Sequence, residues 1–371
     1  MAKKVLVTGG AGFIGSHLVD ALLGKGYQVR ILDNFEPQVH VKQPDYLNRA
    51  AELIRGDIRS NEDLARALKD IDIVYHFAAM VGVGQSMYQI ERYTEVNCCG
   101  TAKLLQQLVA GKRRIEKLVI ASSMSIYGEG AYTCRDCGIL YPKLRSDTQL
   151  KASGWEIKCA DCEDFVHPVA TSEEKPLYPT SVYAVSKRDQ EELCLSVGRA
   201  YNIPTVALRF FNTYGTRQSL SNPYTGVCAI FLSRIKNNQP PLIFEDGKQL
   251  RDFVSVHDIV QACLLAMERK EADYETFNVG TGNAISIYEI AQLLIKLMGK
   301  NIEPLITGKF RSGDIRHCYA DIAKIKEKLG YNPEVTLERG MQEFITWGES
   351  AFALDKFPEA EKELHQKHLL T

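Results

Sequence analysis

The stretch Thr8-Gly9-Gly10-Ala11-Gly12-Phe13-Ile14-Gly15 follows the apolar run Val5-Leu6-Val7 and leads into a segment with helical periodicity. Glycines at these positions let the backbone turn tightly and approach a pyrophosphate at the helix N-terminus. The spacing is Gly-x-x-Gly-x-x-Gly, which differs from the usual Gly-x-Gly-x-x-Gly fingerprint. A strand, a phosphate-binding loop and a helix are therefore expected here, as in a dinucleotide-binding fold.

An acidic residue ends the next apolar run. Gln28-Val29-Arg30-Ile31-Leu32 is followed by Asp33, about 20 residues past the glycines. A carboxylate at this point can accept hydrogen bonds from both hydroxyls of an adenosine ribose, and it would repel a 2′-phosphate. This favours NAD over NADP. The simpler alternative is an ordinary acid in the turn after a strand.

Tyr183-Ala-Val-Ser-Lys187 supplies a candidate base. A phenol titrates at about pH 10 in water, but a lysine one helical turn away favours the phenolate. A bound oxidised nicotinamide would lower the pKa of the phenol further. The pair then suits removal of a proton from an alcohol as hydride leaves the same carbon. Tyr-x-x-x-Lys alone often marks only a solvated helix face, and the upstream glycine loop gives it weight.

Further motifs follow in order along the chain: Gly56-Asp57-Ile58, His76-Phe77-Ala78-Ala79, Ser122-Ser123-Met124-Ser125-Ile126-Tyr127-Gly128, Arg209-Phe210-Phe211-Asn212, Arg251-Asp252 and Arg311-Ser312-Gly313-Asp314. Together with the glycine loop and Tyr183, they resemble the extended short-chain dehydrogenase/reductase family, specifically its nucleotide-sugar epimerases and dehydratases. The resemblance runs from about Lys3 to about Glu349. It implies an α/β fold with a doubly wound parallel sheet (Rossmann) and a smaller C-terminal substrate-binding domain.

The resemblance also implies roles for individual residues. The catalytic residues would be Ser123, Tyr183 and Lys187. NAD would be bound by Gly9, Gly12, Phe13, Ile14, Gly15, Asp33, Asn34, Asp57, Ile58, Phe77, Ala78, Ala79, Asn97, Tyr183 and Lys187. A nucleotide-diphosphate sugar would be bound by Val81, Gly82, Ser125, Asn212, Asn222, Val227, Arg251, Arg311 and Asp314. Arginine suits the diphosphate because its planar fork bonds phosphate oxygens in pairs.

Two positions bear on the reaction that the resemblance implies. Family dehydratases carry an Asp-Glu pair where this chain has Met124 and Ser125, and family decarboxylases carry Glu at the position of Ser125. Neither Met nor Ser can serve as that acid or base, so 4-epimerisation through a transient 4-keto sugar is favoured.

The substrate stays open. The pattern most resembles the dTDP-L-rhamnose 4-epimerase branch, which makes dTDP-6-deoxy-L-talose for surface polysaccharide. UDP-glucose and UDP-glucuronate 4-epimerases share nearly all of this chemistry. An NADP-dependent reductase of NDP-4-keto sugars is the next alternative, and Asp33 speaks against it. A non-catalytic NAD-sensing scaffold is the alternative from another class, and the intact Ser123, Tyr183 and Lys187 speak against that.

Four cysteines stand out between Ser123 and Tyr183. Cys134 and Cys137 form one Cys-x-x-Cys pair, and Cys159 and Cys162 form another, with 21 residues between the pairs. This spacing is typical of a zinc ribbon, so we expect a structural zinc bound by all four thiolates. A zinc-ribbon-like insertion would then occupy residues 131–168. Coincidence and redox dithiols are the alternatives, and a zinc ribbon that binds a partner belongs to the scaffold hypothesis.

Composition narrows the class of protein. The chain has 371 residues, 45% of them apolar and 25% charged, with a net charge of −1. These values are ordinary for a globular protein and give no reason to expect a nucleic-acid or membrane partner. No signal peptide and no apolar run of about 18 residues is apparent, which predicts a cytoplasmic protein with reduced or metal-bound cysteines.

The order of elements predicts the organisation. Strands are expected near Val5, Val29, Leu53, Val74, Leu118 and Val206, and helices from near Phe13, Asn61, Glu91 and Val182. We expect an NAD-binding domain over residues 1–215, interrupted by the cysteine insertion, and a nucleotide-sugar-binding domain over 216–371, with elements of the two intermixed. The helices near 91–110 and 182–201 correspond to those through which the family forms homodimers. Residues 355–371 are expected to be a surface helix or a frayed tail.

Overall fold

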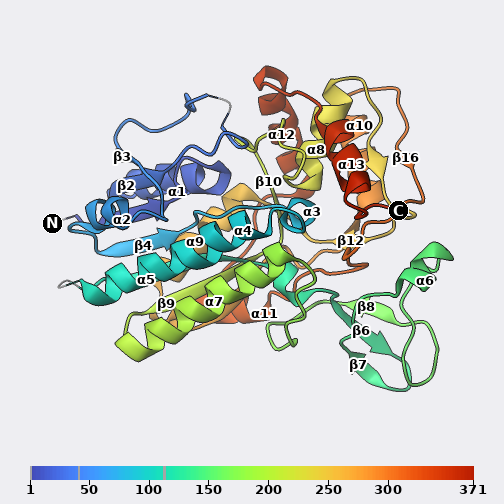
Figure 1. Cartoon of the computed structure of the whole chain (residues 1–371), viewed down its shortest axis with the longest axis horizontal. Helices are drawn as coiled ribbons and strands as arrows, with labels where there is room; N and C mark the ends of the chain where they lie inside the picture. The colour runs from blue at the N-terminus through green and yellow to red at the C-terminus, as the bar shows by residue number, and fades with distance from the viewer. Residues whose placement is uncertain (1, 41, 112–113) are drawn as a thin grey trace.

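A seven-stranded parallel sheet forms the centre of the computed structural model, which describes residues 2–40, 42–111 and 114–371 (Figure 1). Its order is β14-β9-β5-β4-β1-β2-β3. The strands are β1 (Lys4–Thr8), β2 (Gln28–Asp33), β3 (Glu52–Arg55), β4 (Ile73–His76), β5 (Lys117–Ser123), β9 (Thr205–Phe210) and β14 (Thr276–Val279). From β1 the chain passes to β2 and β3 on one side and later to β4 and β5 on the other. This reversal opens a crevice at the carboxyl ends of β1 and β4.

Helices cover both faces of this sheet, as the alternation of strands and helices predicted. Along β1, Val5 and Val7 face one core and Leu6 faces the other, because side chains alternate along a strand. The first core is shared with α1 (Phe13–Gly24) and α9 (Val256–Glu268). The second is shared with α2 (Asn61–Leu68), α5 (Gly100–Ala110) and α7 (Val182–Tyr201). Figure 1 shows α5 and α7 side by side.

The main sheet contains elements from both halves of the chain. β14 pairs with β9 in parallel, from Thr276 opposite Ala207 to Val279 opposite Phe210. α9 packs against α1, and α11 (Ala323–Leu329) packs against β14. A cut at residue 215 therefore does not separate two independent parts, and the two regions intermix within a single core.

The rest of the C-terminal region forms a smaller body around α8 (Val227–Lys236), α10 (Ile287–Leu297) and α12 (Leu337–Ser350). Short strand pairs connect it to the crevice. They are β10 (Asn212–Tyr214) with β13 (Phe253–Ser255), β11 (Leu242–Ile243) with β16 (Leu305–Ile306), and β12 (Leu250–Arg251) with β15 (Ile285–Ser286). Before α5, the chain forms α3 (Val83–Ser86), α4 (Ile90–Tyr93) and a π-helical turn over Thr94–Cys99.

The cysteine-rich segment folds as a separate projection (Figure 1). Its antiparallel sheet has the order β7-β6-β8, from β6 (Ala131–Cys134), β7 (Gly138–Leu140) and β8 (His167–Val169), and it carries the short helix α6 (Asp147–Lys151). Its core contains five buried residues: Tyr132, Cys134, Ile157, Cys159 and Val166. Such a core is small for an independent fold.

The last residues form a surface helix, one of the two forms expected for them, and not a frayed tail. They form α13 (Phe357–Gln366), whose Leu364 is buried, and a terminal stretch whose Leu370 is also buried. The Phe310 and Thr371 backbones donate hydrogen bonds to each other's carbonyls, at 3.2 and 3.1 Å. The apolar residues of this segment thus pack onto the body. Within the described ranges, no helix has the length and apolar character needed to cross a bilayer.

Candidate active site

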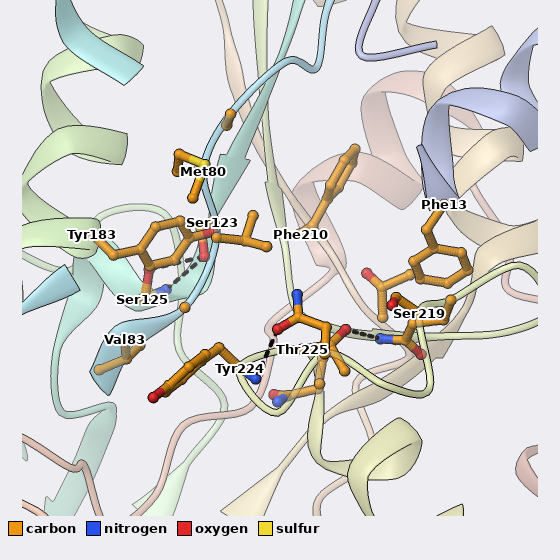
Figure 2. A pocket seen from close by; sticks show the side chains of 18 of the residues that line it. Phe13, Met80, Val83, Ser123, Ser125, Tyr183, Phe210, Ser219, Tyr224 and Thr225 are labelled. Atoms are coloured by element: carbon orange, nitrogen blue, oxygen red, sulfur yellow. Dashed lines mark hydrogen bonds between the residues drawn. The ribbon is translucent and has the colours of Figure 1, made fainter. Parts of the chain in front are cut away.

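A cavity of about 600 Å³ lies between the carboxyl ends of the main sheet and the C-terminal body. This size is typical of a site for an organic ligand. The glycine loop, the segment after β4 and the end of β5 line one side, and segments after residue 210 line the other. Figure 2 shows Tyr183, Ser123 and Ser125 grouped on one wall, and Tyr224 and Thr225 from the C-terminal region line the same cavity.

The glycine loop has the geometry that a dinucleotide needs. Gly9 has φ +70°, and a Cβ there would lie 2.8 Å from the Ala78 nitrogen. A Cβ on Gly15 would lie 2.2 Å from the Gly9 carbonyl oxygen, so a side chain would break the packing of loop against helix. Gly12 caps α1 without a side-chain acceptor, which leaves N–H groups of the first turn for an anion. Gly9, Gly12, Phe13, Ile14 and Gly15 all line the cavity.

Acidic side chains lie at the end where the adenosine of a dinucleotide would bind. Asp33 is buried, and its Oδ2 accepts a hydrogen bond from the Ala11 N–H at 3.0 Å. Asn34 donates to Asp57 Oδ2 at 3.1 Å. Burial raises the pKa of Asp57, but hydrogen bonds from Arg59 and Asn34 outweigh it and hold the pKa at about 2. Asp33, Asn34, Asp57 and Ile58 all line the cavity, as do Phe77, Ala78 and Ala79 on the other side of β1.

The catalytic candidates come together from two elements. Ser123 ends β5, and Tyr183 and Lys187 lie in the first turns of α7, which starts where the Ser181 hydroxyl accepts from the Ala184 N–H. The Tyr183 hydroxyl is hydrogen-bonded to Ser123. Ser125 Oγ donates to Ser123 Oγ at 2.9 Å (Figure 2). A substrate hydroxyl beside Tyr183 would therefore meet a connected set of O–H groups.

The protein alone does not lower the pKa of the Tyr183 phenol, in contrast to the sequence-based expectation. Burial raises this pKa, and the Ser123 hydrogen bond opposes it. Lys187 is also buried, which lowers the pKa of its ammonium to about 8. That ammonium donates to the Ala121 carbonyl and to Gln190 Oε1, and no hydrogen bond to Tyr183 is present in the described structure. Since Lys187 is bonded to other groups and not to the phenol, we expect the positive charge of a bound oxidised nicotinamide to be what favours the phenolate form of Tyr183.

Gln190 accepts a hydrogen bond from Lys187 and connects it to the buried residues His76 and Thr8, a role that the sequence did not indicate. Its Nε2 lies 3.0 Å from His76 Nε2, and His76 Nδ1 lies 2.8 Å from the Thr8 hydroxyl. Burial lowers the pKa of His76 to about 3, so the imidazole is neutral. The only signal for Gln190 was its position three residues after Lys187, on the same helix face.

Asn97 is the one expected cofactor residue that is not among those lining the cavity. Its amide donates to the Met80 carbonyl at 3.0 Å and to Ser186 Oγ at 2.9 Å, and its Oδ1 accepts from the Met80 N–H. The π-helical turn around Asn97 directs this side chain toward the segment after β4. Asn97 thus holds the segment after β4 and helix α7 together, and both of these line the cavity.

All of the expected substrate residues line the cavity: Val81, Gly82, Ser125, Asn212, Asn222, Val227, Arg251, Arg311 and Asp314. The two arginines are tied to one segment. Arg311 Nε donates to Asp314 Oδ2 at 2.8 Å, and its guanidinium lies over the Phe244 ring at 5.0 Å. Arg251 donates to the carbonyls of Ile315 and Arg316 at 2.7 and 2.8 Å.

The C-terminal helix adds contacts at the mouth of the cavity that the sequence did not indicate. Phe357 lines the cavity. Tyr224 donates to Glu363 Oε2 at 2.8 Å, and the hydroxyls of Tyr224 and Tyr88 are 2.7 Å apart. A segment expected to be peripheral thus contacts residues beside the catalytic wall.

The four cysteines of the insertion converge. Their sulfur atoms lie within 4.8 Å of one another, with Cys134 and Cys162 at 3.4 Å and Cys137 and Cys159 at 3.7 Å. Sulfurs about 2.3 Å from a tetrahedral ion are about 3.8 Å apart, so the set fits a zinc ion. Backbone N–H groups of Cys162 and Asp161 lower the pKa of the Cys159 thiol to about 7.

Comparison with known proteins agrees with this geometry. Residues 5–147 match the NAD dependent epimerase/dehydratase family, and residues 166–344 match the model described as GDP-mannose 4,6 dehydratase. The dTDP-L-rhamnose 4-epimerase of Burkholderia thailandensis is 35% identical over 93% of this chain and 94% of its own length. The chain belongs to the NAD dependent epimerase/dehydratase family. It is therefore an NAD-dependent enzyme of the epimerase and dehydratase class.

Solved structures of family members have the same fold. A UDP-glucose 4-epimerase of Thermotoga maritima, solved with UDP-glucose, is 32% identical with a TM-score of 0.77, covering 93% of this chain and 98% of its own. A UDP-glucuronic acid 4-epimerase of Bacillus cereus, solved with UDP-glucuronic acid and NAD, is 30% identical with a TM-score of 0.77, covering 94% and 100%. The two family models leave residues 148–165 unmatched, and this gap falls within the cysteine-rich insertion.

Proposed function

We propose that this epimerase-family enzyme is a nucleotide-sugar 4-epimerase that acts through a transient 4-keto sugar. One observation carries the proposal. Tyr183, Ser123 and Ser125 form a hydrogen-bonded set on the catalytic wall, and Met124 and Ser125 occupy the positions where a dehydratase carries its acid pair. This wall offers a group for alcohol oxidation and no carboxyl pair at those positions for elimination.

The residues divide the chemistry among them. When bound, oxidised nicotinamide supplies a reversible hydride acceptor. Tyr183 takes the proton of the C4 hydroxyl as the alcohol becomes a ketone, and it returns the proton when the ketone is reduced from the other face. Ser123 holds the reacting oxygen in line with the phenol. Arg251 and Arg311 hold the diphosphate, so the sugar can turn while the nucleotide stays bound.

A neutral sugar suits the hexose end better than a uronate. Among the described residues that line the cavity, the lysines and arginines are Lys187, Arg251 and Arg311, and all three have the roles given above. A C6 carboxylate would therefore lack a cationic partner. Met80 and Val83 line the same cavity as Tyr183 (Figure 2), and such apolar side chains suit the methyl group of a 6-deoxy sugar. dTDP-L-rhamnose, with dTDP-6-deoxy-L-talose as product, is the substrate that we propose; UDP-glucose is the alternative.

Incubation of the purified enzyme with dTDP-L-rhamnose, UDP-glucose and UDP-glucuronate, followed by NMR of the sugar, tests this proposal. We expect the C4 epimer of dTDP-L-rhamnose and no net change in the redox state of NAD. A stable 4-keto-6-deoxy product from an NDP-glucose would instead identify a dehydratase. Stoichiometric consumption of NADH or NADPH would identify a reductase.

We also propose that the insertion binds one structural zinc ion through Cys134, Cys137, Cys159 and Cys162. Four thiolates fill a tetrahedral site and leave no position for water, so the ion would stabilise the segment and take no part in the chemistry. Elemental analysis of the purified protein should find zinc, and Cys134→Ser should lose it. Cys99→Ser, at an exposed cysteine outside the cluster, is the matched control. Metal-free protein with an unchanged melting temperature would contradict the proposal.

We further propose a homodimer formed through α4, α5 and α7. Support comes from exposed apolar side chains on two of these helices: Ile90 on α4, and Val185 and Leu193 on α7, are 54%, 44% and 38% exposed. Light scattering on the eluting protein should give twice the chain mass. Val185→Glu should shift it toward the monomer because a charge would be buried at the interface.

A further inference from the structure

The insertion contacts the substrate side of the cavity through one buried arginine. Arg145 lies on the segment between β7 and α6, and its side chain is 2% exposed. Its two terminal nitrogens each donate to a different oxygen of Glu245, both at 2.9 Å. Glu245 is also buried and lines the cavity. A bidentate pair of this kind fixes the orientation of both groups.

The same guanidinium reaches the segment that carries Arg311. Arg145 Nη2 lies 3.3 Å from the Asp314 carbonyl, and Asp314 accepts from Arg311 Nε through its side chain. Arg145 also donates to the Trp155 carbonyl at 3.0 Å, which ties it to the other half of the insertion. Asp314 is thus held by the insertion through its backbone while its carboxylate orients Arg311.

A second buried arginine extends the contact to Arg251. Arg316 has no exposed side-chain surface and donates to Glu245 at 3.0 Å, to Asp246 and to Glu156 of the insertion. The carbonyl of Arg316 accepts from Arg251 at 2.8 Å. Glu245, the carboxylate that Arg145 and Arg316 share, therefore links the insertion to residues 311–316, the segment to which both candidate diphosphate arginines are bonded.

We propose that Arg145 is a positioning residue for nucleotide-sugar binding: by holding Glu245 and the Asp314 carbonyl, it couples the cysteine-rich insertion to the placement of Arg311 and Arg251. The inference rests on the proposed function, in which these two arginines bind the diphosphate. The insertion would then affect substrate affinity and not the chemical step, because Arg145 makes no hydrogen bond to Tyr183, Ser123 or Lys187 in the described structure.

Replacing Arg145 in the full-length enzyme with its bound NAD tests the assignment. We expect Arg145→Met to raise KM for the sugar nucleotide, and Kd for UDP or dTDP by calorimetry, about tenfold or more, the effect of losing one well-placed charged hydrogen bond. Turnover at saturation and NAD content should stay within about twofold of wild type. Lys151→Met, at an exposed cation of the same insertion, is the control and should leave both constants unchanged.

Other outcomes overturn the assignment. A lower melting temperature with unchanged KM and Kd would make Arg145 a purely structural residue, and a loss of kcat at unchanged KM would also contradict it. If Arg145→Met does not fold, Arg145→Lys decides, because an ammonium cannot form the fork to Glu245 and Kd should still rise several-fold. Wild-type enzyme that binds neither UDP nor dTDP would refute the diphosphate site of the proposed function itself, and is thus distinguishable from a defect confined to the variant.

Discussion

Tyr183→Phe separates the chemistry of the site from its fold. The change removes only the phenol oxygen, so the ring keeps its edge contact with Tyr93, whose centroid lies 6.4 Å away. The fold loses one hydrogen bond, to Ser123, at a cost of about 1 kcal/mol. The variant also lacks the proton acceptor on which turnover is proposed to depend. Acid–base groups contribute about 10²–10⁴-fold, which corresponds to about 3–5 kcal/mol of activation free energy.

The assay compares initial rates of C4 epimer formation by NMR with the melting temperature of the same preparation. Tyr201→Phe, at an exposed tyrosine on the same helix, is the control and should keep full activity. Loss of turnover with a melting temperature near that of wild type is the expected pattern. If Tyr183→Phe keeps more than about a tenth of wild-type turnover, another group takes the proton and the assignment of the base is wrong.

Three further changes probe neighbouring parts of the site. Lys187→Met removes an ammonium that is bonded to the Ala121 carbonyl and Gln190 and not to Tyr183, so the acid limb of the kcat profile should stay near its wild-type pH; a limb that moves to higher pH would show that Lys187 does lower the pKa of the phenol. Asp33→Ser should improve NADP binding relative to NAD in a fluorescence titration, and a wild type that already prefers NADP would contradict the ribose assignment. Deletion of residues 357–371 removes Glu363 from Tyr224 and the backbone pairing beside Arg311, so KM should rise several-fold; unchanged kinetics would show that α13 is dispensable.

The parts of the site that could be predicted from the sequence depend on local pattern. The glycine loop, Asp33 and the Tyr183–Lys187 pair are each set by spacing within one strand–loop–helix unit or one helical turn. The alternation of apolar runs likewise predicted six strands of the main sheet. β14 escaped the prediction because it is only four residues long, Thr276–Val279, and the polar Asn278 interrupts it, so it lacks the apolar run that marked the other strands.

The parts that could not be predicted depend on contacts between distant segments. The pair of Arg145 and Glu245 joins residues 100 positions apart, and no spacing rule indicates it. The sequence showed a lysine one turn from Tyr183, but it did not show that the ammonium is directed at the Ala121 carbonyl. Asn97 matched a family motif, yet its side chain holds Met80, which only the fold reveals.

The difference between local and distant contacts also distinguishes the proposed proton-transfer groups from the proposed substrate-binding groups. The groups proposed to act on hydrogen lie at the end of β5 and in the first turns of α7, two elements that pack against each other. The groups proposed to hold the nucleotide diphosphate lie on a segment braced from outside, by the insertion through Arg145 and by the terminal residues through Phe310 and Thr371. Changes in those outer segments can therefore alter affinity for the sugar nucleotide while the proton acceptor stays in place.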